Sequence, residues 1–488
     1  MSEERTTIIG QRASLLPRPN AWVTVTPLPV ARRGLVSTVG IAVQGLVRFC
    51  YSLLIGRTLP AGFLSATNSA ISTAMLSTLL WPTSLASAAG KFLAREAGAP
   101  ERNAALTHHL SRLCLISSVL LSVAAASVTG FWLVPGHPLT AVFVGLLTLG
   151  YSGYTFVRSA HYATNRVARA TAWDVLSFLV SVLGLVLVLV FGMNDLLLLP
   201  ITVGYLAYTA LGWPRGSKGD LDDALRSEVG HYVLWGVLGS LTTGGFLQLT
   251  MVLAHQTGDT EGADAYAAAL TLATPASMIG SVLSLLLLPS LSEAVGRGDL
   301  DSMRRQTDIA SRGLVAVLGA VFGVLIVGSR LVVALVWPNL SGTVPILEVL
   351  LVATFLLTAA TACSESINSF SRHGARTLSV IRAAGFVVGL GVVAALVPGL
   401  SVLGIAIGYL AGMLITGLIP IGVVWRRDGQ RWGSSSLRAL AGVALAACAV
   451  VVRDMQGPVG WLDLLLVAVF AVGWLALLGR DVRLLLSR

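Results

Sequence analysis

The residues of this sequence that stand out for chemistry are charged side chains inside long apolar runs. Arg48 lies in the first run, Arg330 and Glu348 lie in two consecutive later runs, and Asp174 and Arg382 lie near the starts of two others. Charges at such depth are costly in hydrocarbon, so they mark ligand or ion pathways, or ion pairs between helices. The sequence has no glycine-rich phosphate loop, no His-x-x-x-His pair and no nucleophile elbow.

The composition is that of a polytopic membrane protein. Of the 488 residues, 55% are hydrophobic and 11% are charged, and the mean hydropathy is +0.81, whereas soluble domains carry about 25% charged residues. The 7 histidines, 23 acidic residues and 4 cysteines are few and scattered, so we expect no enzyme, no cofactor and no metal site. The net charge of +10 is spread between apolar segments, which favours membrane topology over nucleic-acid binding.

Fourteen apolar runs qualify as membrane-spanning helices, because about 20 apolar residues cross about 30 Å of hydrocarbon. If both termini lie in the cytoplasm of a bacterium, the tails, the even-numbered loops and the helix ends next to those loops hold 29 of the 33 Lys and Arg residues, as the positive-inside rule requires. We therefore predict a multi-pass protein of the cytoplasmic membrane. The predicted spans are 34–56, 62–89, 110–134, 139–157, 171–192, 196–213, 230–254, 264–289, 313–336, 344–364, 378–397, 402–424, 438–452 and 459–479.

The sequence repeats itself at a period near 205 residues. Gly-Tyr-Leu-Ala at 204–207 recurs at 408–411, and Pro-x-Ser-Leu or a similar run closes the second and the eighth predicted spans. Two lobes of six helices follow, both with the same orientation, and the natural place for a substrate is between them. The predicted parts are a cytoplasmic tail at 1–33, expected to be disordered, an N-lobe at 34–213, a linker at 214–229, a C-lobe at 230–425, two further helices in 426–479 and a tail at 480–488.

Three short motifs resemble those of a known family. They are Arg-Thr-Leu-Pro-Ala-Gly-Phe at 57–63, Ala-Tyr-Ala-Ala at 265–268 and Leu-Pro-Ser-Leu-Ser-Glu at 288–293. Together with the doubled six-helix plan, they resemble the multidrug/oligosaccharidyl-lipid/polysaccharide exporter superfamily, in its polysaccharide and lipid-linked oligosaccharide flippase branch. The resemblance implies two lobes that alternately open a central cavity to either side. It also implies a polyprenyl-diphosphate-linked saccharide as cargo, with membrane lipids and polysaccharide assembly proteins as partners.

This resemblance assigns expected roles to individual residues. Arg48, near mid-membrane, is the leading candidate for a diphosphate contact, and a structural arginine bonded to carbonyl groups is the alternative. Arg57 belongs to the family turn at the outer interface, where it would cap the first helix or meet lipid headgroups. Gln44 and Gln248 are candidates for lining the saccharide path, although polar side chains also pack inside helix bundles.

The remaining candidates concern gating. Arg330 and Glu348 lie at similar depth on consecutive helices, which predicts an ion pair or a transport role. Asp174 and Arg382 occupy equivalent places in the two repeats, where they either lock the cytoplasmic side or face headgroups. Pro275 is a candidate hinge, although prolines are tolerated in many membrane helices without movement.

Three other functions remain open at this stage. A lipid II flippase is favoured by the last two helices, which form a lipid-facing groove in such proteins, but that branch usually has more arginines in its first helix. A multidrug antiporter commonly has an acidic residue deep in its N-lobe, and Asp174 lies too near the cytoplasmic end. A membrane glycosyltransferase or polymerase would need a large outer loop with catalytic groups, and only Asp259, Glu261 and Asp264 cluster outside.

Overall fold

The chain folds into α-helices, which confirms the all-α class expected from the sequence. The computed structural model describes residues 30–370, 374–456 and 459–486, and within these ranges the backbone forms helices and connecting turns without strands. In the described part of the chain, ten helices are long and apolar enough to cross a membrane. The total of fourteen spans stays a prediction, because the structure divides some of the predicted segments and joins two others.

The N-lobe begins with a long helix and continues with a divided one. The second predicted span breaks at Trp81, where Pro82 starts a new helix, since proline lacks the N–H group that a continuing helix would use. The elements are α2 (Val30–Thr58), α3 (Phe63–Leu79), α4 (Pro82–Arg95), α5 (Pro100–Val128), η2 (Thr129–Leu133), α6 (Pro138–Ala163), α7 (Val167–Val190), η3 (Asn194–Leu196) and α8 (Leu199–Gly212).

The C-lobe starts inside the predicted linker, because α9 begins at Asp223. A short π-helical turn, η4, interrupts the seventh predicted span, and such turns are frequent at functional sites. The elements are α9 (Asp223–Ser240), η4 (Leu241–Gly245), α10 (Phe246–Gln256), α11 (Thr260–Gly296), α12 (Leu300–Val327), α13 (Ser329–Val336), α14 (Thr343–Ala359), α15 (Thr361–Phe370) and α16 (Gly374–Asp428).

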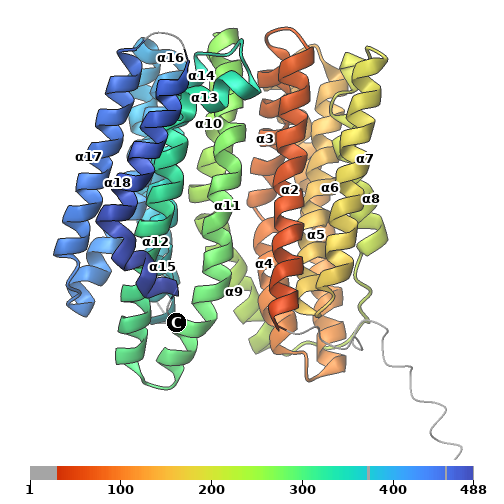
Figure 1. Cartoon of the computed structure of the whole chain (residues 1–488). Helices are drawn as coiled ribbons and strands as arrows, with labels where there is room; N and C mark the ends of the chain where they lie inside the picture. The colour runs from red at the N-terminus through yellow and green to blue at the C-terminus, as the bar shows by residue number, and fades with distance from the viewer. Residues whose placement is uncertain (1–29, 371–373, 457–458, 487–488) are drawn as a thin grey trace, which may run out of the picture.

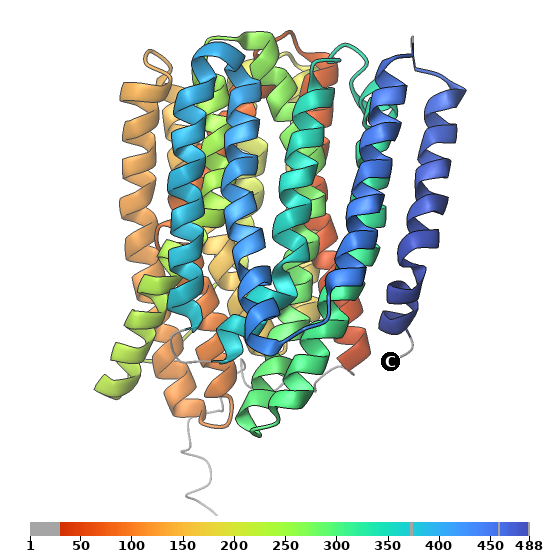
Figure 2. The same cartoon turned by 90° about the vertical axis from the view of Figure 1, so that its left-hand side faces the viewer.

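The long run of α16 covers two predicted spans as a helical hairpin. At Ser401, φ of 48° and ψ of −130° break the helix, and the two arms then pack against each other. Glycines allow this close approach: a Cβ atom on Gly412 would lie 2.7 Å from the carbonyl oxygen of Gly385 on the other arm. Figure 2 shows the arms meeting at one end of the molecule.

The two lobes stand side by side (Figure 1), with the N-lobe coloured red to yellow and the C-lobe green to light blue. We call the end where α2 begins and α18 ends the lower face, and the opposite end the upper face. The lobes meet through α2, α3 and α4 on one side and α9, η4, α10 and α11 on the other. The last two helices, α17 (Gly433–Asp454) and α18 (Trp461–Leu486), cover the outer flank of the C-lobe.

Aromatic side chains on α18 fit into notches that glycines leave on α12. Any Cβ atom on Gly319 would collide with the ring of Trp474, and one on Gly323 would collide with Phe470. The indole Nε1 of Trp474 also donates a hydrogen bond of 2.7 Å to the carbonyl oxygen of Ala316. The Gly-x-x-x-Gly spacing therefore serves helix packing, since lipid offers no hydrophobic force to press two helices together.

We expect Trp474→Ala to lower the apparent Tm of the purified protein by several degrees. The substitution leaves a cavity between α12 and α18, and truncating a packed tryptophan costs about 3 to 5 kcal/mol. Thermal unfolding in detergent, followed by tryptophan fluorescence, measures the change. Trp461→Ala is the control, because Trp461 is on the same helix but is 71% exposed. Equal melting temperatures for the two variants would contradict the packing argument.

Candidate functional site

A cavity of about 210 Å³ lies between the lobes at the level of Arg48. Both lobes supply its walls, and polar and aromatic side chains dominate them. The N-lobe contributes Gln44, Gly45, Arg48, Met75, Leu79, Thr83, Tyr151, Thr155 and Tyr205, and the C-lobe contributes Gly244, Gln248 and Thr274. Three of the four residues expected to bind substrate, Gln44, Arg48 and Gln248, thus come together here.

Arg48 joins the two lobes across this cavity. Its Nη2 donates a hydrogen bond of 2.9 Å to Ser72 Oγ on α3, and its Nη1 donates one of 3.2 Å to Gln248 Oε1 on α10 of the other lobe. Met75 Sδ also lies 3.4 Å from Nη1. All three partners are neutral, so none of them compensates the charge of the guanidinium.

The charge of Arg48 is buried without a counter-ion. The residue is only 6% exposed, and no acidic side chain in the described part of the chain forms a salt bridge with it. Its buried Nε has no hydrogen-bond partner among the described residues. Because an uncompensated buried charge is costly, a site of this kind is suited to an anionic ligand.

A second arginine, Arg158 of α6, lies beside the cavity. It is at the level of Gln44, which is one turn of α2 closer to the lower face than Arg48. Arg158 Nη1 donates a hydrogen bond of 3.0 Å to Gln44 Oε1, and its Nε lies 3.3 Å from Asp174 Oδ2. Asp174 also accepts a 2.9 Å hydrogen bond from Tyr154. Sequence analysis missed Arg158, because the predicted fourth span ended at 157. The helix α6 continues past that point to Ala163, and Ala160 and His161 in this last part are buried.

The upper face is sealed where α3 meets α11. Asp264 of the C-lobe accepts hydrogen bonds from the backbone N–H groups of Gly62, at 2.6 Å, and Ser65, at 2.7 Å, so it caps the first turn of α3 across the lobe boundary. Gly62 has φ of +96°, a conformation that glycine adopts most readily. The sequence signal for this contact was only the acidic cluster at the start of α11.

Arg57 strengthens the same seal and does not line the cavity. Its Nε donates a 2.8 Å hydrogen bond to the carbonyl oxygen of Val336, and its Nη2 donates to that of Leu335, both in the C-lobe. Trp337 lies next to them, packed so closely that a Cβ atom on Gly56 would lie 2.6 Å from its Nε1. Arg57 therefore joins the lobes at the upper face rather than capping its own helix.

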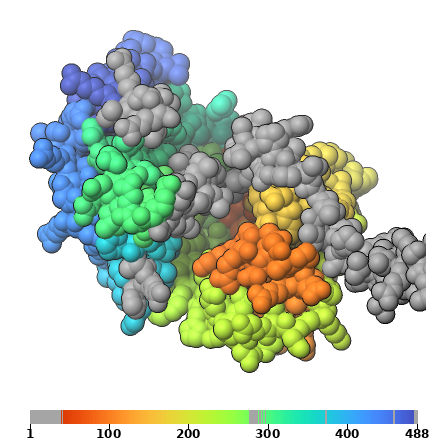
Figure 3. All heavy atoms as spheres, turned by 90° about the horizontal axis from the view of Figure 1, so that it is seen from below, coloured from red at the N-terminus to blue at the C-terminus, as the bar shows by residue number. Residues whose placement is uncertain are grey.

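The lower side of the lobe boundary is hollowed, as the view from below shows (Figure 3). On one flank of this side, α4 still packs against α9. Arg95 and Glu228 form an exposed ion pair there, with 2.8 Å between Nη1 and Oε1, and Lys91 Nζ lies 4.5 Å from the ring centre of Tyr232. The structure is thus closed above the cavity and recessed below it.

The predicted gating pairs have other partners in the structure. Glu348 pairs with Arg453 of α17 at 2.8 Å, whereas Arg330 donates a 2.8 Å hydrogen bond to the carbonyl oxygen of Arg453. Asp174 pairs with Arg158 inside the N-lobe, while Arg382 lies beside Gly239 of α9 in the C-lobe. Neither pair is therefore formed in this conformation, because depth in the membrane does not determine which way a side chain points around its helix. A lock between Asp174 and Arg382 when the lobes close on the lower side stays a prediction.

Pro275 lies within α11, which continues from Thr260 to Gly296, so the hinge stays a prediction. Among the described residues, no three His, Cys, Asp or Glu side chains come together in a way that could hold a metal ion.

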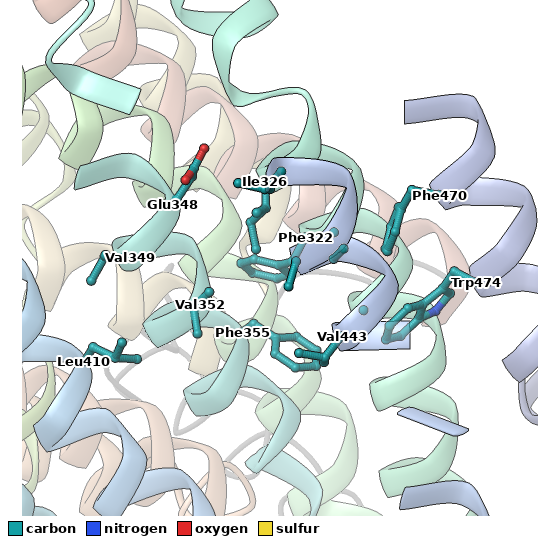
Figure 4. A pocket seen from close by; sticks show the side chains of 15 residues that line it. Phe322, Ile326, Glu348, Val349, Val352, Phe355, Leu410, Val443, Phe470 and Trp474 are labelled. Carbon is teal, nitrogen blue, oxygen red and sulfur yellow. The ribbon is translucent and has the colours of Figure 1, made fainter. Parts of the chain in front are cut away.

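An apolar groove of about 290 Å³ lies between the C-lobe and the α17–α18 pair. Figure 4 shows the rings of Phe322, Phe355, Phe470 and Trp474 along it, with the carboxylate of Glu348 near one end. Val352 and Val443 complete its walls. At the other end of the pair, Asp481 of α18 binds Arg312 of α12 and Arg438 of α17, which fixes the pair to the lobe.

The architecture thus consists of two helical lobes that meet around a cavity, with an added helix pair on the flank of the second lobe. No family model and no curated protein matches this chain. Several solved structures are, however, similar to it. The lipid II flippase MurJ in an inward closed conformation has a TM-score of 0.66 at 12% identity and covers 93% of this chain and 100% of its own. An inward-facing multidrug resistance MATE family transporter of the MOP superfamily has a TM-score of 0.63 at 15% identity, with coverages of 80% and 98%.

A third similar structure is a MOP superfamily transporter from Pyrococcus furiosus, described as having a binding pocket of reverse polarity. Its TM-score is 0.60 at 14% identity, and it covers 82% of this chain and 95% of its own. At these identities the likeness establishes the fold, which is that of MATE and MurJ transporters. It does not establish the polysaccharide branch or any substrate.

Proposed function

We propose that this protein carries a polyprenyl diphosphate linked to a saccharide across the bacterial cytoplasmic membrane, by alternating access of its two lobes. The observation that carries the proposal is Arg48, a buried and uncompensated cation in a cavity between the lobes. A diphosphate cannot enter hydrocarbon unaided, and a guanidinium binds phosphate oxygens through strong paired hydrogen bonds. The lower face is the cytoplasmic one, as the distribution of Lys and Arg predicts.

The groove beside α17 and α18 supports a lipid cargo. Its walls are apolar and face the membrane side of the C-lobe, so a hydrocarbon chain in it would lie against side chains as apolar as lipid. The resemblance to lipid II flippases implies the same role for this helix pair. A headgroup at Arg48 and a tail in apolar surroundings match the two halves of an amphiphile.

Filling the groove is expected to slow transport of long-chain substrates. We expect Val443→Trp to reduce their apparent affinity about fivefold, because the indole ring takes up space in the groove and removes about ten packing contacts of about 0.1 kcal/mol each from the hydrocarbon chain. A concentration series in reconstituted vesicles measures the effect. Leu440→Trp is the control, because Leu440 is on the same helix but is 65% exposed and does not line the groove. If both variants slow transport equally, the groove does not hold the tail.

The lipid II alternative shares the diphosphate and differs in the saccharide. It is favoured by one observation: the MurJ structure covers 93% of the chain, whereas the MATE structures cover 80% to 83%. The cavity does not choose between these saccharides, so both belong to the proposal. A multidrug antiporter is less suited, since the uncompensated charge of Arg48 repels cationic drugs.

The acids clustered at the upper face give little support to an enzymatic function. Asp264 caps α3, and Asp259 accepts hydrogen bonds from Ser401 and from the backbone of Gly262. Two of the three clustered outer acids are thus committed to holding helices and loops in place. They are poorly available as general acids or bases.

A flipping assay tests the proposal directly. The purified protein is reconstituted into vesicles that contain a fluorescent polyprenyl-diphosphate disaccharide, and an impermeant quencher is added outside. We expect quenching to proceed well beyond the outer half of the label, whereas it stops there in vesicles without protein. If quenching stops at half of the label although the reconstituted protein is folded, the proposal is wrong. Uptake of a cationic dye against an ion gradient would instead support the antiporter.

A further inference from the structure

A polar cluster around Arg158 and Gln44 adjoins the cavity at Arg48 on the side of the lower face. Gln44 and Arg48 are four residues apart on α2, so they lie on the same side of that helix. Gln44 lines the cavity and accepts the hydrogen bond from Arg158 Nη1. Arg158 is therefore the next guanidinium that a headgroup would meet between the recessed lower side and Arg48.

Asp174 holds Arg158 through a loose contact. The Nε–Oδ2 distance is 3.3 Å, but neither atom takes part in a hydrogen bond within the described residues. The two Nη groups point elsewhere, to Gln44 and to the hydroxyl of Tyr162 at 3.2 Å. A well-formed arginine–carboxylate pair uses two parallel hydrogen bonds, and this pair uses none.

The positive charges of Arg158 and Arg48 are therefore compensated to different degrees. Arg158 is 17% exposed at its side chain and shares its charge with Asp174, which is 1% exposed. Arg48 has no acidic partner among the described residues. An anion is therefore attracted weakly to Arg158 and strongly to Arg48. A transport path needs sites that bind the cargo without trapping it.

We propose that Arg158 and Gln44 form a second phosphate-binding site, and that Asp174 competes with the cargo phosphate for Arg158. This inference rests on the proposed function, since it assigns the site to phosphate oxygens of the same headgroup. Asp174 keeps the site weak when it is empty. The headgroup then passes from the weaker site at Arg158 to the stronger one at Arg48.

Binding of two soluble probes tests the competition. Inorganic pyrophosphate and farnesyl diphosphate are titrated into the full-length protein in detergent, with binding followed by calorimetry. We expect Asp174→Asn to strengthen binding about tenfold, because a negative charge next to the site is removed. A gain for both probes means that phosphate alone is recognised, and a gain for farnesyl diphosphate alone means that the prenyl chain is required. No gain for either probe overturns the proposal.

A double variant separates competition from a structural ion pair. If Arg158 only neutralises Asp174, then Arg158→Gln with Asp174→Asn removes both charges and restores wild-type binding and transport. We expect the double variant to lose the gain of Asp174→Asn and to transport more slowly than wild type. Arg158→Lys keeps the ion pair and so protects folding, and we expect it to bind both probes more weakly than wild type. Wild-type behaviour of both variants would overturn the inference.

Variants of Arg48 distinguish this inference from the proposed function. If Arg48→Gln abolishes probe binding while the Arg158 and Asp174 variants bind as wild type does, the second site is wrong and the proposed function stands. If Arg48→Gln also leaves binding unchanged, the proposed function itself is contradicted. The apparent Tm of each variant is measured alongside, so that a loss of binding is not confused with unfolding.

Discussion

Replacing Arg48 with glutamine is expected to slow transport of a lipid-linked saccharide at least about 100-fold, with no loss of stability. Two charge-assisted hydrogen bonds to phosphate oxygens contribute about 3 kcal/mol together, which corresponds to about 100-fold. The neutral partners Ser72 and Gln248 can bond glutamine as well. Removing an uncompensated buried charge costs the fold nothing and can stabilise it. Flipping rates in vesicles and the apparent Tm in detergent measure the two effects.

Arg453 provides the matched control for Arg48. It is also a buried arginine in a membrane helix, 1% exposed, but it is paired with Glu348 and Asp454 and bonded to Ser329. We expect Arg453→Gln to lower the apparent Tm, because it leaves the carboxylate of Glu348 without its partner. If Arg48→Gln lowers the Tm in the same way and transport falls only with the amount of folded protein, Arg48 is a structural arginine.

The contrast between these two arginines shows what the sequence could predict. Hydropathy predicted the helices, because a run of apolar residues long enough to cross the bilayer can satisfy its backbone only as a helix. The internal repeat predicted a seam between two lobes, and the structure brings Gln44, Arg48 and Gln248 to one cavity in that seam. Residues 200 positions apart were thus placed together by the repeat rather than by any local pattern.

Side-chain partners could not be predicted in this way. Depth placed Glu348 opposite Arg330, but the helix rotation turns its carboxylate toward Arg453 on an added helix. Arg158 was missed because α6 extends beyond its apolar stretch into the polar lower region, where hydropathy carries no signal. The Asp264 seal was missed because it depends on backbone N–H groups, which any residue except proline provides.

Replacing Asp264 with alanine is expected to shift the protein about 100-fold toward a state that is open at the upper face. The carboxylate accepts two hydrogen bonds from backbone N–H groups of the other lobe, and charged bonds of this kind contribute about 1.5 kcal/mol or more each. They exist only while the lobes touch at the upper face, so their loss weakens that state alone. The remaining contacts of Arg57 set a limit to the shift.

Labelling of a cysteine at Ser52 measures this shift. Ser52 is 1% exposed and accepts a 2.9 Å hydrogen bond from Thr271 of the other lobe, so it is reached from the upper side only when the seal opens. With the native cysteines replaced, we expect an impermeant maleimide to label Ser52→Cys faster once Asp264→Ala is added. Asp463→Ala is the matched control, since Asp463 caps α18 away from the lobe boundary. Equal labelling in both backgrounds would mean that Asp264 only stabilises the fold and does not hold the lobes together.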